Sequence, residues 1–319
     1  MEIVRLHYPL SDEITSNEDT VLAMGFFDGF HRGHQAVLEK AKQRAKELGA
    51  KFCVLTYNHH PALVYKKLSS HEKRYITLLK DKLALLEKFG VDRVYLVDYT
   101  FQFQNQNEVE FVDNFIKRFR AKAVVAGFDH TYGSDPKKAN MENLSKFSDG
   151  SFEVISVDPI NFEGKKVSST RIRRALDDAD VATVNQLLGR PFKTHGVIVH
   201  GREVGRLLGY PTANIEHNEM QWLPAIGIYI VAVSYDGKKH LGMASIGRNV
   251  TFEDSTAITV EINILDFNEN IYGETLTVEW LEHIRDEVKF QTPQDLTTQL
   301  YDDEVVTREY LKKHPDILN

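Results

Sequence analysis

The segment GFFDGFHRGH, which begins at Gly25, gathers groups that can bind an anion. Gly25, Gly29 and Gly33 allow a backbone to approach a phosphate without an intervening Cβ atom. His31 and His34 are three residues apart, so both imidazoles can face the same way at the start of a helix. Two such side chains can donate hydrogen bonds to phosphate oxygens as charge develops in a transition state. The segment is therefore predicted to hold a phosphate group.

Two other interpretations of this segment stay open. Glycines at a strand–helix turn are often needed only for the conformation of the turn, and an isolated H-x-x-H pattern is often structural. A zinc site built from His31, His34, His59 and His60 is also conceivable. We favour the phosphate site, because a phosphate cradle explains the glycines and a metal cage does not.

The flanking patterns predict an α/β sheet with this segment at its mouth. Residues 21–27, VLAMGFF, form a short apolar run typical of a buried strand, and apolar residues recur at helical spacing from His34 to Gly49. Further strands are predicted over residues 51–57, 92–99, 121–129 and 151–160, and further helices over 76–90 and 107–119. Strands that alternate with helices indicate a parallel, doubly wound sheet, in which ligands bind at the carboxyl ends of the strands beside a helix N-terminus.

The pattern changes after about residue 184. Runs rich in β-branched residues then follow one another, separated by glycines and polar turns; they cover 196–201, 227–235, 241–247, 257–265 and 274–284. A helical pattern returns over residues 292–314. This order indicates a β-barrel or sandwich with a C-terminal helix. We therefore predict two domains, 1–184 and 185–319.

The segment GREVGRLLGYPTANI, residues 201–215, is the chemical signal of the second domain. Thr212 offers a hydroxyl and Asn214 a carbonyl oxygen, and both are hard donors that suit Mg²⁺ beside phosphates. Gly201 and Gly209 permit a loop that folds over a nucleotide.

Glu261 is a second chemical signal in this half of the chain. It lies mid-strand between Val260 and Ile262, where burying a carboxylate costs free energy, so that its presence indicates a functional role. The alternative is an ordinary outward-facing position, since Val260 and Ile262 would face the other way.

Composition and charge exclude several classes of protein. The chain has 319 residues, of which 42% are hydrophobic and 27% charged, and its net charge is −7. Residues 1–184 carry 27 Lys and Arg against 26 Asp and Glu, and residues 185–319 carry 12 against 20, so neither half has the positive excess typical of nucleic-acid binding. No apolar run approaches the roughly 20 residues that span a bilayer, and the N-terminus is too polar for a signal peptide. We expect a cytoplasmic protein, monomeric or weakly homo-oligomeric, with no nucleic-acid or membrane partner.

These motifs carry a resemblance that covers nearly the whole chain. GFFDGFHRGH matches the G-x-F-D-G-x-H-x-G-H signature of nucleotidylyltransferases, and VSSTRIRRAL, residues 167–176, resembles the segment that closes their triphosphate site. GYPTAN is similar to the G-x-P-T-A-N motif of riboflavin kinases. With AGFDHTYG and TYNHHP between them, the motifs resemble the bacterial bifunctional riboflavin kinase/FMN adenylyltransferase, or FAD synthetase, family.

The resemblance implies a Rossmann-like nucleotidylyltransferase domain followed by a six-stranded riboflavin kinase barrel. It implies an enzyme that phosphorylates riboflavin to FMN with ATP and then adenylylates FMN to FAD with release of pyrophosphate, using Mg²⁺. The catalytic residues that it implies are Glu261, His31, His34 and Arg171. The residues implied to bind ATP are Gly25, Phe26, Phe27, Asp28, Gly29, His31, Gly33, His34, Ser168, Ser169, Thr170, Arg171, Arg173, Gly201, Gly209, Thr212 and Asn214. Flavin contacts fall on Asn58, Asp129, Tyr132, Arg285 and Phe290, and Mg²⁺ ligands on Thr212 and Asn214.

The chain departs from the family pattern at three positions. His59 and Val250 stand where prolines are common, and His130 occupies a position often held by an aromatic residue. A member with only one of the two activities, or a flavin-binding sensor without turnover, therefore remains an alternative. A nucleotidylyltransferase that activates a phosphorylated alcohol with CTP is another, although the PTAN segment speaks against it.

Overall fold

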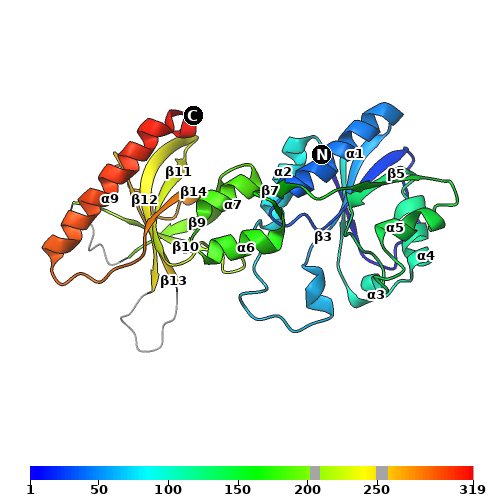
Figure 1. Cartoon of the computed structure of the whole chain (residues 1–319), viewed down its shortest axis with the longest axis horizontal. Helices are drawn as coiled ribbons and strands as arrows, with labels where there is room; N and C mark the ends of the chain where they lie inside the picture. Colours follow the sequence, from blue (N-terminus) through cyan, green and yellow to red (C-terminus); the bar gives the residue numbers. More distant parts are fainter. Residues whose placement is uncertain (202–208, 249–257, 319) are drawn as a thin grey trace. The chain divides into compact units, whose positions relative to one another are not determined.

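The computed structural model describes residues 1–201, 209–248 and 258–318. The chain divides into two compact units, Met1–Ser169 and Thr170–Asn319 (Figure 1). In the described ranges, no helix combines the length and the apolar character needed to cross a membrane.

The first unit is built on a six-stranded sheet in which every pair of neighbours is parallel. Its strands are β1 (Glu2–Leu6), β2 (Thr20–Met24), β3 (Lys51–Tyr57), β4 (Arg93–Val97), β5 (Ala121–Gly127) and β6 (Glu153–Val157), in the order β1-β4-β3-β2-β5-β6. The chain runs outward from β2 through β3 to β4 and then returns to β5 on the other side of β2. The order therefore reverses between β2 and β5, and open α/β sheets bind ligands at such a point.

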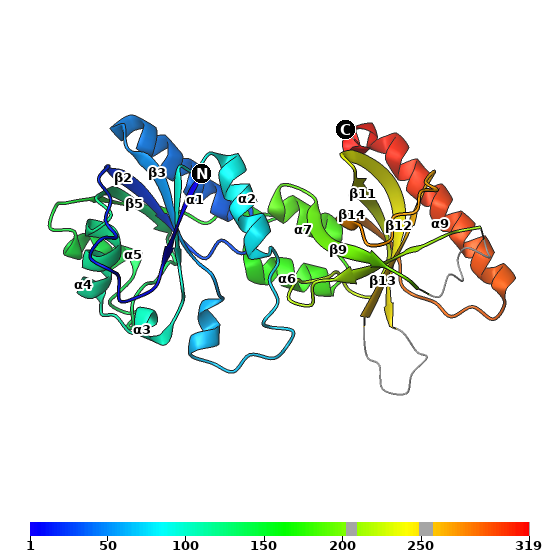
Figure 2. The same cartoon turned by 180° about the vertical axis from the view of Figure 1, so that it is seen from behind.

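Helices cover both faces of this sheet, as a doubly wound fold requires (Figures 1 and 2). The helices are α1 (Arg32–Leu48), α2 (Leu79–Phe89), α3 (Phe101–Gln104), α4 (Glu108–Phe111) and α5 (Met141–Leu144), and a short hairpin joins β7 (Asn161–Phe162) to β8 (Lys165–Lys166). On one face of the sheet, α1 and α2 pack through buried residues such as Leu38 and Leu86. On the other face, the helices α3, α4 and α5 pack through Phe103, Phe111 and Leu144. The predicted doubly wound parallel sheet is confirmed.

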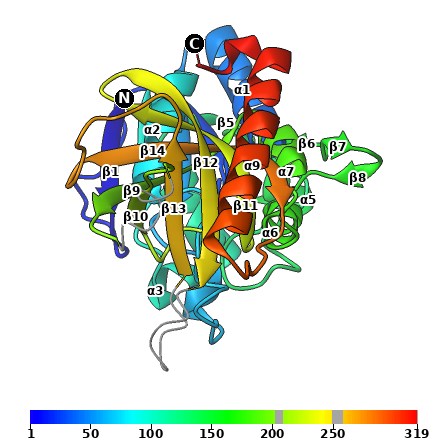
Figure 3. The same cartoon turned by 90° about the vertical axis from the view of Figure 1, so that its left-hand side faces the viewer.

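The second unit contains a closed antiparallel barrel of six strands, which confirms the predicted barrel. Its strands are β9 (Phe192–Val199), β10 (Ala213–His217), β11 (Gly227–Tyr235), β12 (Lys238–Arg248), β13 (Ile258–Ile264) and β14 (Thr275–Arg285), closed in the order β10-β13-β12-β11-β14-β9. The predicted C-terminal helix is α9 (Pro293–Lys313), which packs on β12 (Figure 3). Thr292 begins α9 with a capping box to Asp295.

The first unit ends at Ser169, fifteen residues before the predicted boundary at 184, and two helices follow that belong largely to the second unit. These helices are α6 (Ser169–Asp177) and α7 (Val181–Leu188). The indole of Trp222 donates to the Asp177 carboxylate over 3.1 Å, and the Asn185 amide donates to the carbonyl of Trp280 over 2.8 Å. Asp177 of α6 and Asn185 of α7 therefore each form a hydrogen bond with a residue of the barrel half of the chain.

Candidate functional site

The turn after β2 bends sharply because three of its residues have positive φ angles. Phe27, Gly29 and Phe30 have φ values of +57°, +84° and +48°. The side chains of Phe27 and Phe30 are buried beneath α1 and hold this conformation in place. A Cβ atom on Gly25 would lie 2.9 Å from the Phe27 ring, so glycine is needed where the ring folds back over the chain.

His31 and His34 lie together at the start of α1, as the sequence predicted. His31 is the N-cap of the helix, and its Nδ1 atom accepts a hydrogen bond from the backbone N–H of His34 over 3.3 Å. The two imidazole rings stack with centroids 3.6 Å apart and planes 15° apart. Both imidazole rings therefore lie at the N-terminus of α1, where the helix dipole favours the binding of an anion.

His34 carries a buried nitrogen with no hydrogen-bond partner within the described ranges, its Nδ1 atom. Burial holds the pKa of His34 well below its ordinary value, and the nearby charges of His31, Lys82 and Lys166 lower it further. The ring is thus a neutral imidazole in a positively charged surrounding. An unpartnered buried nitrogen at a helix N-terminus fits a phosphate oxygen as its missing partner.

Asp28 links three segments of the first unit. Its carboxylate accepts hydrogen bonds from the backbone N–H groups of Ile76 and Thr77 at 3.0 and 3.1 Å. Its carbonyl oxygen accepts the Ser169 hydroxyl at 2.9 Å. Asp28 therefore orders the turn and fixes the start of the VSST segment against the glycine-rich segment, although the two lie 141 residues apart in the chain.

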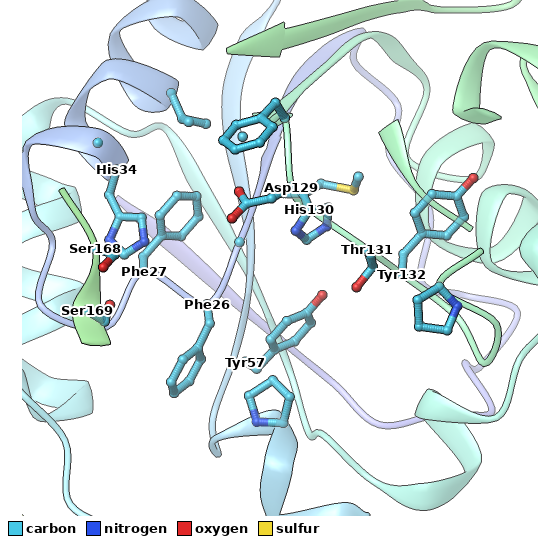
Figure 4. A pocket seen from close by; sticks show the side chains of 18 of the residues that line it. Phe26, Phe27, His34, Tyr57, Asp129, His130, Thr131, Tyr132, Ser168 and Ser169 are labelled. Carbon is cyan, nitrogen blue, oxygen red and sulfur yellow. The ribbon is translucent and has the colours of Figure 1, made fainter. Parts of the chain in front are cut away.

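A pocket of about 780 Å³ opens at the carboxyl ends of β2 and β5. The predicted nucleotide residues that line it are Gly25, Phe26, Phe27, His31, Gly33, His34, Ser168 and Ser169, and Asp129 and Tyr132 line it among the predicted flavin residues. Figure 4 shows His34, Ser168 and Ser169 at one end, Thr131 and Tyr132 at the other, and Asp129 and His130 between them. The pocket thus has a polar end beside α1 and an end rich in aromatic side chains.

Other predicted residues of the first signature segments lie elsewhere. Asn58 is absent from the pocket lining; its amide donates to Asp98 over 2.7 Å and accepts the backbone N–H of Tyr99 over 2.9 Å. Thr170, Arg171 and Arg173 belong to the second unit, where the Arg173 guanidinium lies 5.6 Å from the Trp222 ring centroid. Their predicted roles toward the nucleotide stay predictions.

Lys82 is a residue of this region that the sequence reasoning missed. It is buried, and its ammonium donates to the carbonyls of Phe26 and Tyr57 over 3.0 and 2.9 Å and to the Thr56 hydroxyl over 3.2 Å. It also lies 4.7 Å from the Phe26 ring centroid. Burial lowers its pKa to about 7, against a raising effect of Asp28. Lys82 therefore connects the segment after β2 to the end of β3 through Phe26 and Tyr57, two residues that line the pocket.

The barrel brings together the second set of predicted residues. The Thr212 hydroxyl donates to the carboxylate of Glu261 over 3.3 Å, and Asn214 pairs with Glu261 across β10 and β13. A Cβ atom on Gly201 would lie 1.9 Å from the Asn214 amide nitrogen, so only glycine allows this close approach. Glu261 is half-buried between the buried Val260 and Ile262.

This group offers an oxygen-rich donor set suited to Mg²⁺. Thr212 provides a hydroxyl, Asn214 an amide oxygen and Glu261 a carboxylate, all hard oxygen donors. Thr212 also lines a pocket of about 440 Å³ with Pro211 and residues 267–272. Val250 and the segment between Gly201 and Gly209 lie outside the described residues.

Arg285 and Phe290, predicted as flavin contacts, lie beside each other, and Arg285 also binds α9. Arg285 binds the buried carboxylate of Asp303 through two nitrogens at 2.9 and 2.7 Å. Its guanidinium lies 5.9 Å from the Phe290 ring centroid. This pairing fixes the end of β14 to α9, and the flavin role of both residues stays a prediction.

The zinc alternative finds no support in the structure. Within residues 1–201, 209–248 and 258–318, no cluster of three or more His, Cys, Asp or Glu side chains could hold a metal ion. His60 instead accepts the backbone N–H of Ala62 and packs edge-on against Phe26, and His59 is exposed.

Both parts of the chain match known protein families. Residues 13–171 match the FAD synthetase family model, and residues 188–311 match the riboflavin kinase model. The bifunctional riboflavin kinase/FMN adenylyltransferase of Listeria monocytogenes is 42% identical over 316 residues, which cover 99% of this chain and 100% of the relative. The protein of the same name from Bacillus subtilis is 35% identical and covers 95% of each chain.

A solved structure also shares the fold. A Streptococcus pneumoniae protein described as a macrolide-efflux protein superposes with a TM-score of 0.90 at 39% identity, over 97% of this chain and 99% of its own. The matched models, the full-length relatives and the two sites lead to one conclusion. The chain belongs to the family of bifunctional riboflavin kinase/FMN adenylyltransferases.

Proposed function

We propose that the chain phosphorylates riboflavin to FMN with ATP in its barrel and adenylylates FMN to FAD with ATP, releasing pyrophosphate, in its first unit. The observation that carries the proposal is the hydrogen bond from Ser169 to Asp28, because it joins the two signature segments at one pocket. That pocket lies where the strand order reverses, at the N-terminus of α1.

Adenylylation needs alignment and charge stabilisation, and no general base. The nucleophile is the FMN phosphate, whose second pKa is near 6, so it is mostly a dianion at neutral pH. The imidazoles of His31 and His34 and the N–H groups at the start of α1 would stabilise the charge that develops around the α-phosphorus of ATP. Ser168 and Ser169 would border the leaving pyrophosphate, with Arg171 as the predicted cationic group.

Phosphorylation of riboflavin needs a base. The nucleophile is a neutral ribityl hydroxyl, which attacks poorly until its proton is taken. The carboxylate of Glu261 is the proposed base, and its hydrogen bond with Thr212 holds it beside the predicted metal ligands. Mg²⁺, when bound through Thr212 and Asn214, supplies neutralisation of the phosphate oxygens.

Chromatographic separation of flavins tests the proposal. The protein is incubated with riboflavin, ATP and Mg²⁺, and FMN and then FAD are expected to accumulate. Riboflavin that binds without being converted would favour the flavin-binding sensor, and accumulation of FMN alone would favour a member with one activity. The cytoplasmic location stays a prediction that cell fractionation can check. The monomeric or weakly oligomeric state stays a prediction that sedimentation can check.

A further inference from the structure

The loop after β5 carries two buried, unsatisfied polar atoms on side chains that line the pocket of the first unit. The backbone N–H of His130 donates to the carbonyl of Gly127 over 2.9 Å, which closes a tight turn at the end of the strand. The Nε2 atom of His130 is buried, and so is the hydroxyl of Tyr132 two residues later. Neither atom has a hydrogen-bond partner among the residues that the structure describes, and both side chains line the pocket (Figure 4).

Buried polar atoms without partners are rare in folded proteins, because each forfeits the hydrogen bonds that water gave it in the unfolded chain. Where such atoms line a cavity, a ligand can supply the missing partner. A site built to hydrogen-bond its ligand also rejects an analogue that leaves its polar groups unpaired. The two side chains are therefore the part of the lining where a ligand can be recognised by hydrogen bonds.

The surroundings of His130 indicate which part of the ligand it meets. Five aromatic side chains of the pocket lining form a chain of ring contacts that ends at Tyr132, two residues after His130; they are Tyr57, Tyr99, Phe103, Phe111 and Tyr132. A flat ring system packs well on such rings. His34, which is suited to phosphate, lies at the end of the pocket beside α1, and His130 lies between it and Tyr132 (Figure 4). The ligand portion beside His130 is therefore a planar ring.

The charge state of His130 agrees with a neutral ligand group. Burial lowers the pKa of His130 to about 4, although the adjacent Asp129 acts to raise it. The Asp129 carboxylate is itself paired with Lys166. At neutral pH the imidazole is therefore uncharged and forms a single directional hydrogen bond through Nε2, as a donor or an acceptor according to its tautomer.

We infer that the Nε2 atom of His130 forms a hydrogen bond with the polar edge of the flavin ring of FMN and is a specificity-determining residue of the adenylylation site. This inference rests on the proposed conversion of FMN to FAD. It assigns a ligand contact to the position where the family resemblance implies an aromatic side chain.

Steady-state kinetics of FAD formation from FMN test the inference on the full chain. His130→Phe keeps a flat side chain and removes the nitrogen, whereas His130→Gln keeps a polar group near the Nε2 position. We expect His130→Phe to raise KM for FMN on the order of tenfold and to leave KM for ATP unchanged. His130→Gln is expected to recover most of the loss. His71→Phe, at an exposed histidine outside the pocket lining, is the matched control and should behave as wild type.

A second measurement needs no variant activity. In protein labelled with ¹⁵N-histidine, saturating FMN is expected to shift the Nε2 resonance of His130, which is assigned by its loss in His130→Gln. An unmoved resonance, an unchanged KM for FMN in His130→Phe, or equal losses in the Phe and Gln variants would each overturn the inference. A wild-type protein that makes no FAD would instead contradict the proposed function itself.

Discussion

The two sites of this chain are built from different kinds of backbone. The first lies in a turn between β2 and α1, where residues with positive φ angles and a helix N-terminus expose N–H groups and place two imidazoles in contact. The second lies on paired strands, where the register sets Asn214 opposite Glu261 and the Thr212 hydroxyl reaches the same carboxylate. The turn supplies donors for anions, and the strands supply oxygen ligands and a base.

This difference follows the chemistry of the two nucleophiles. A phosphate dianion is already reactive and must be aligned against a second anion, which donors and positive charge achieve. An alcohol must lose a proton, which a carboxylate accepts. If the assignment is correct, each site can be disabled without disabling the other.

The largest effect is expected at Glu261. Glu261→Gln removes the proposed base while keeping the size of the side chain and an acceptor for Thr212. Riboflavin phosphorylation should fall about 10²- to 10⁴-fold, since this is the usual contribution of a general base. FAD formation from FMN should be unchanged. Glu216→Gln, at an exposed glutamate of the neighbouring strand β10, is the control and should affect neither reaction.

Changes at the two histidines should produce the reverse pattern. His34→Ala removes the unpartnered imidazole, and FAD formation should fall about 10²- to 10³-fold, as when one donor to a developing charge is lost. His31→Ala would also remove the cap of α1, so His31→Asn, which retains a capping side chain, separates catalysis from stability. Assays of FMN formation from riboflavin provide the comparison. A parallel loss of both activities would contradict separate sites.

Lys82 provides a pH-dependent test of the first unit alone. Its pKa is about 7 in the folded protein against an ordinary value of 10.5. Between these values the unfolded chain holds the proton that the folded chain has released. The contribution of Lys82 to the free energy of unfolding therefore rises with pH from about 7 to 10 and is smallest below 7. The free energy of unfolding of wild type should rise over this range relative to that of Lys82→Met.

The measurement uses the placement of the tryptophans. Trp222 and Trp280, the two tryptophans of the chain, lie in the second unit. Tryptophan fluorescence therefore reports the unfolding of the second unit, whereas circular dichroism reports the unfolding of both units. In urea unfolding at several pH values, the difference between wild type and Lys82→Met should appear only in the unfolding of the first unit, which circular dichroism detects and fluorescence does not. Lys80→Met, at an exposed position of the same helix, should show no pH-dependent difference.

The smallest effect is expected at Tyr132. Its buried hydroxyl has no partner in the described parts of the chain, so Tyr132→Phe removes an unsatisfied group and should leave the thermal midpoint unchanged or slightly higher. KM for FMN should nevertheless rise about 3- to 10-fold if the hydroxyl binds the flavin. A lower midpoint with an unchanged KM would indicate that Tyr132 serves packing only.

Much of the fold could be predicted, because buried strands and amphipathic helices leave periodic patterns. The strand over residues 51–57 agrees with β3, and the helices at 76–90 and 292–314 differ from α2 and α9 by one to three residues at each end. The edge strand β1 was missed, since most of its residues are exposed and its sequence lacks a buried run. The helix predicted over 107–119 is α4 followed by a π-helix at Val112–Lys117, a difference in hydrogen bonding that side-chain spacing does not encode.

The site was predictable where its residues are contiguous in sequence and less so where distant partners decide a role. The turn residues line the pocket as expected. Asn58 and Arg285, however, bind Asp98 and Asp303, which are 40 and 18 residues away, and nothing local predicts these pairs. Lys82 left one signal: it lies between Leu79 and Leu86 on the apolar stripe of its helix, where a lysine needs buried acceptors.

Mixing two disabled variants tests the central claim of two independent sites most directly. Glu261→Gln and His34→Ala are each incubated with riboflavin, ATP and Mg²⁺, alone and together, and the flavins are separated. We predict that neither variant alone converts riboflavin to FAD at the wild-type rate, that His34→Ala accumulates FMN, and that the mixture restores FAD because Glu261→Gln adenylylates the released FMN. A mixture that forms no more FAD than the separate variants would contradict the account.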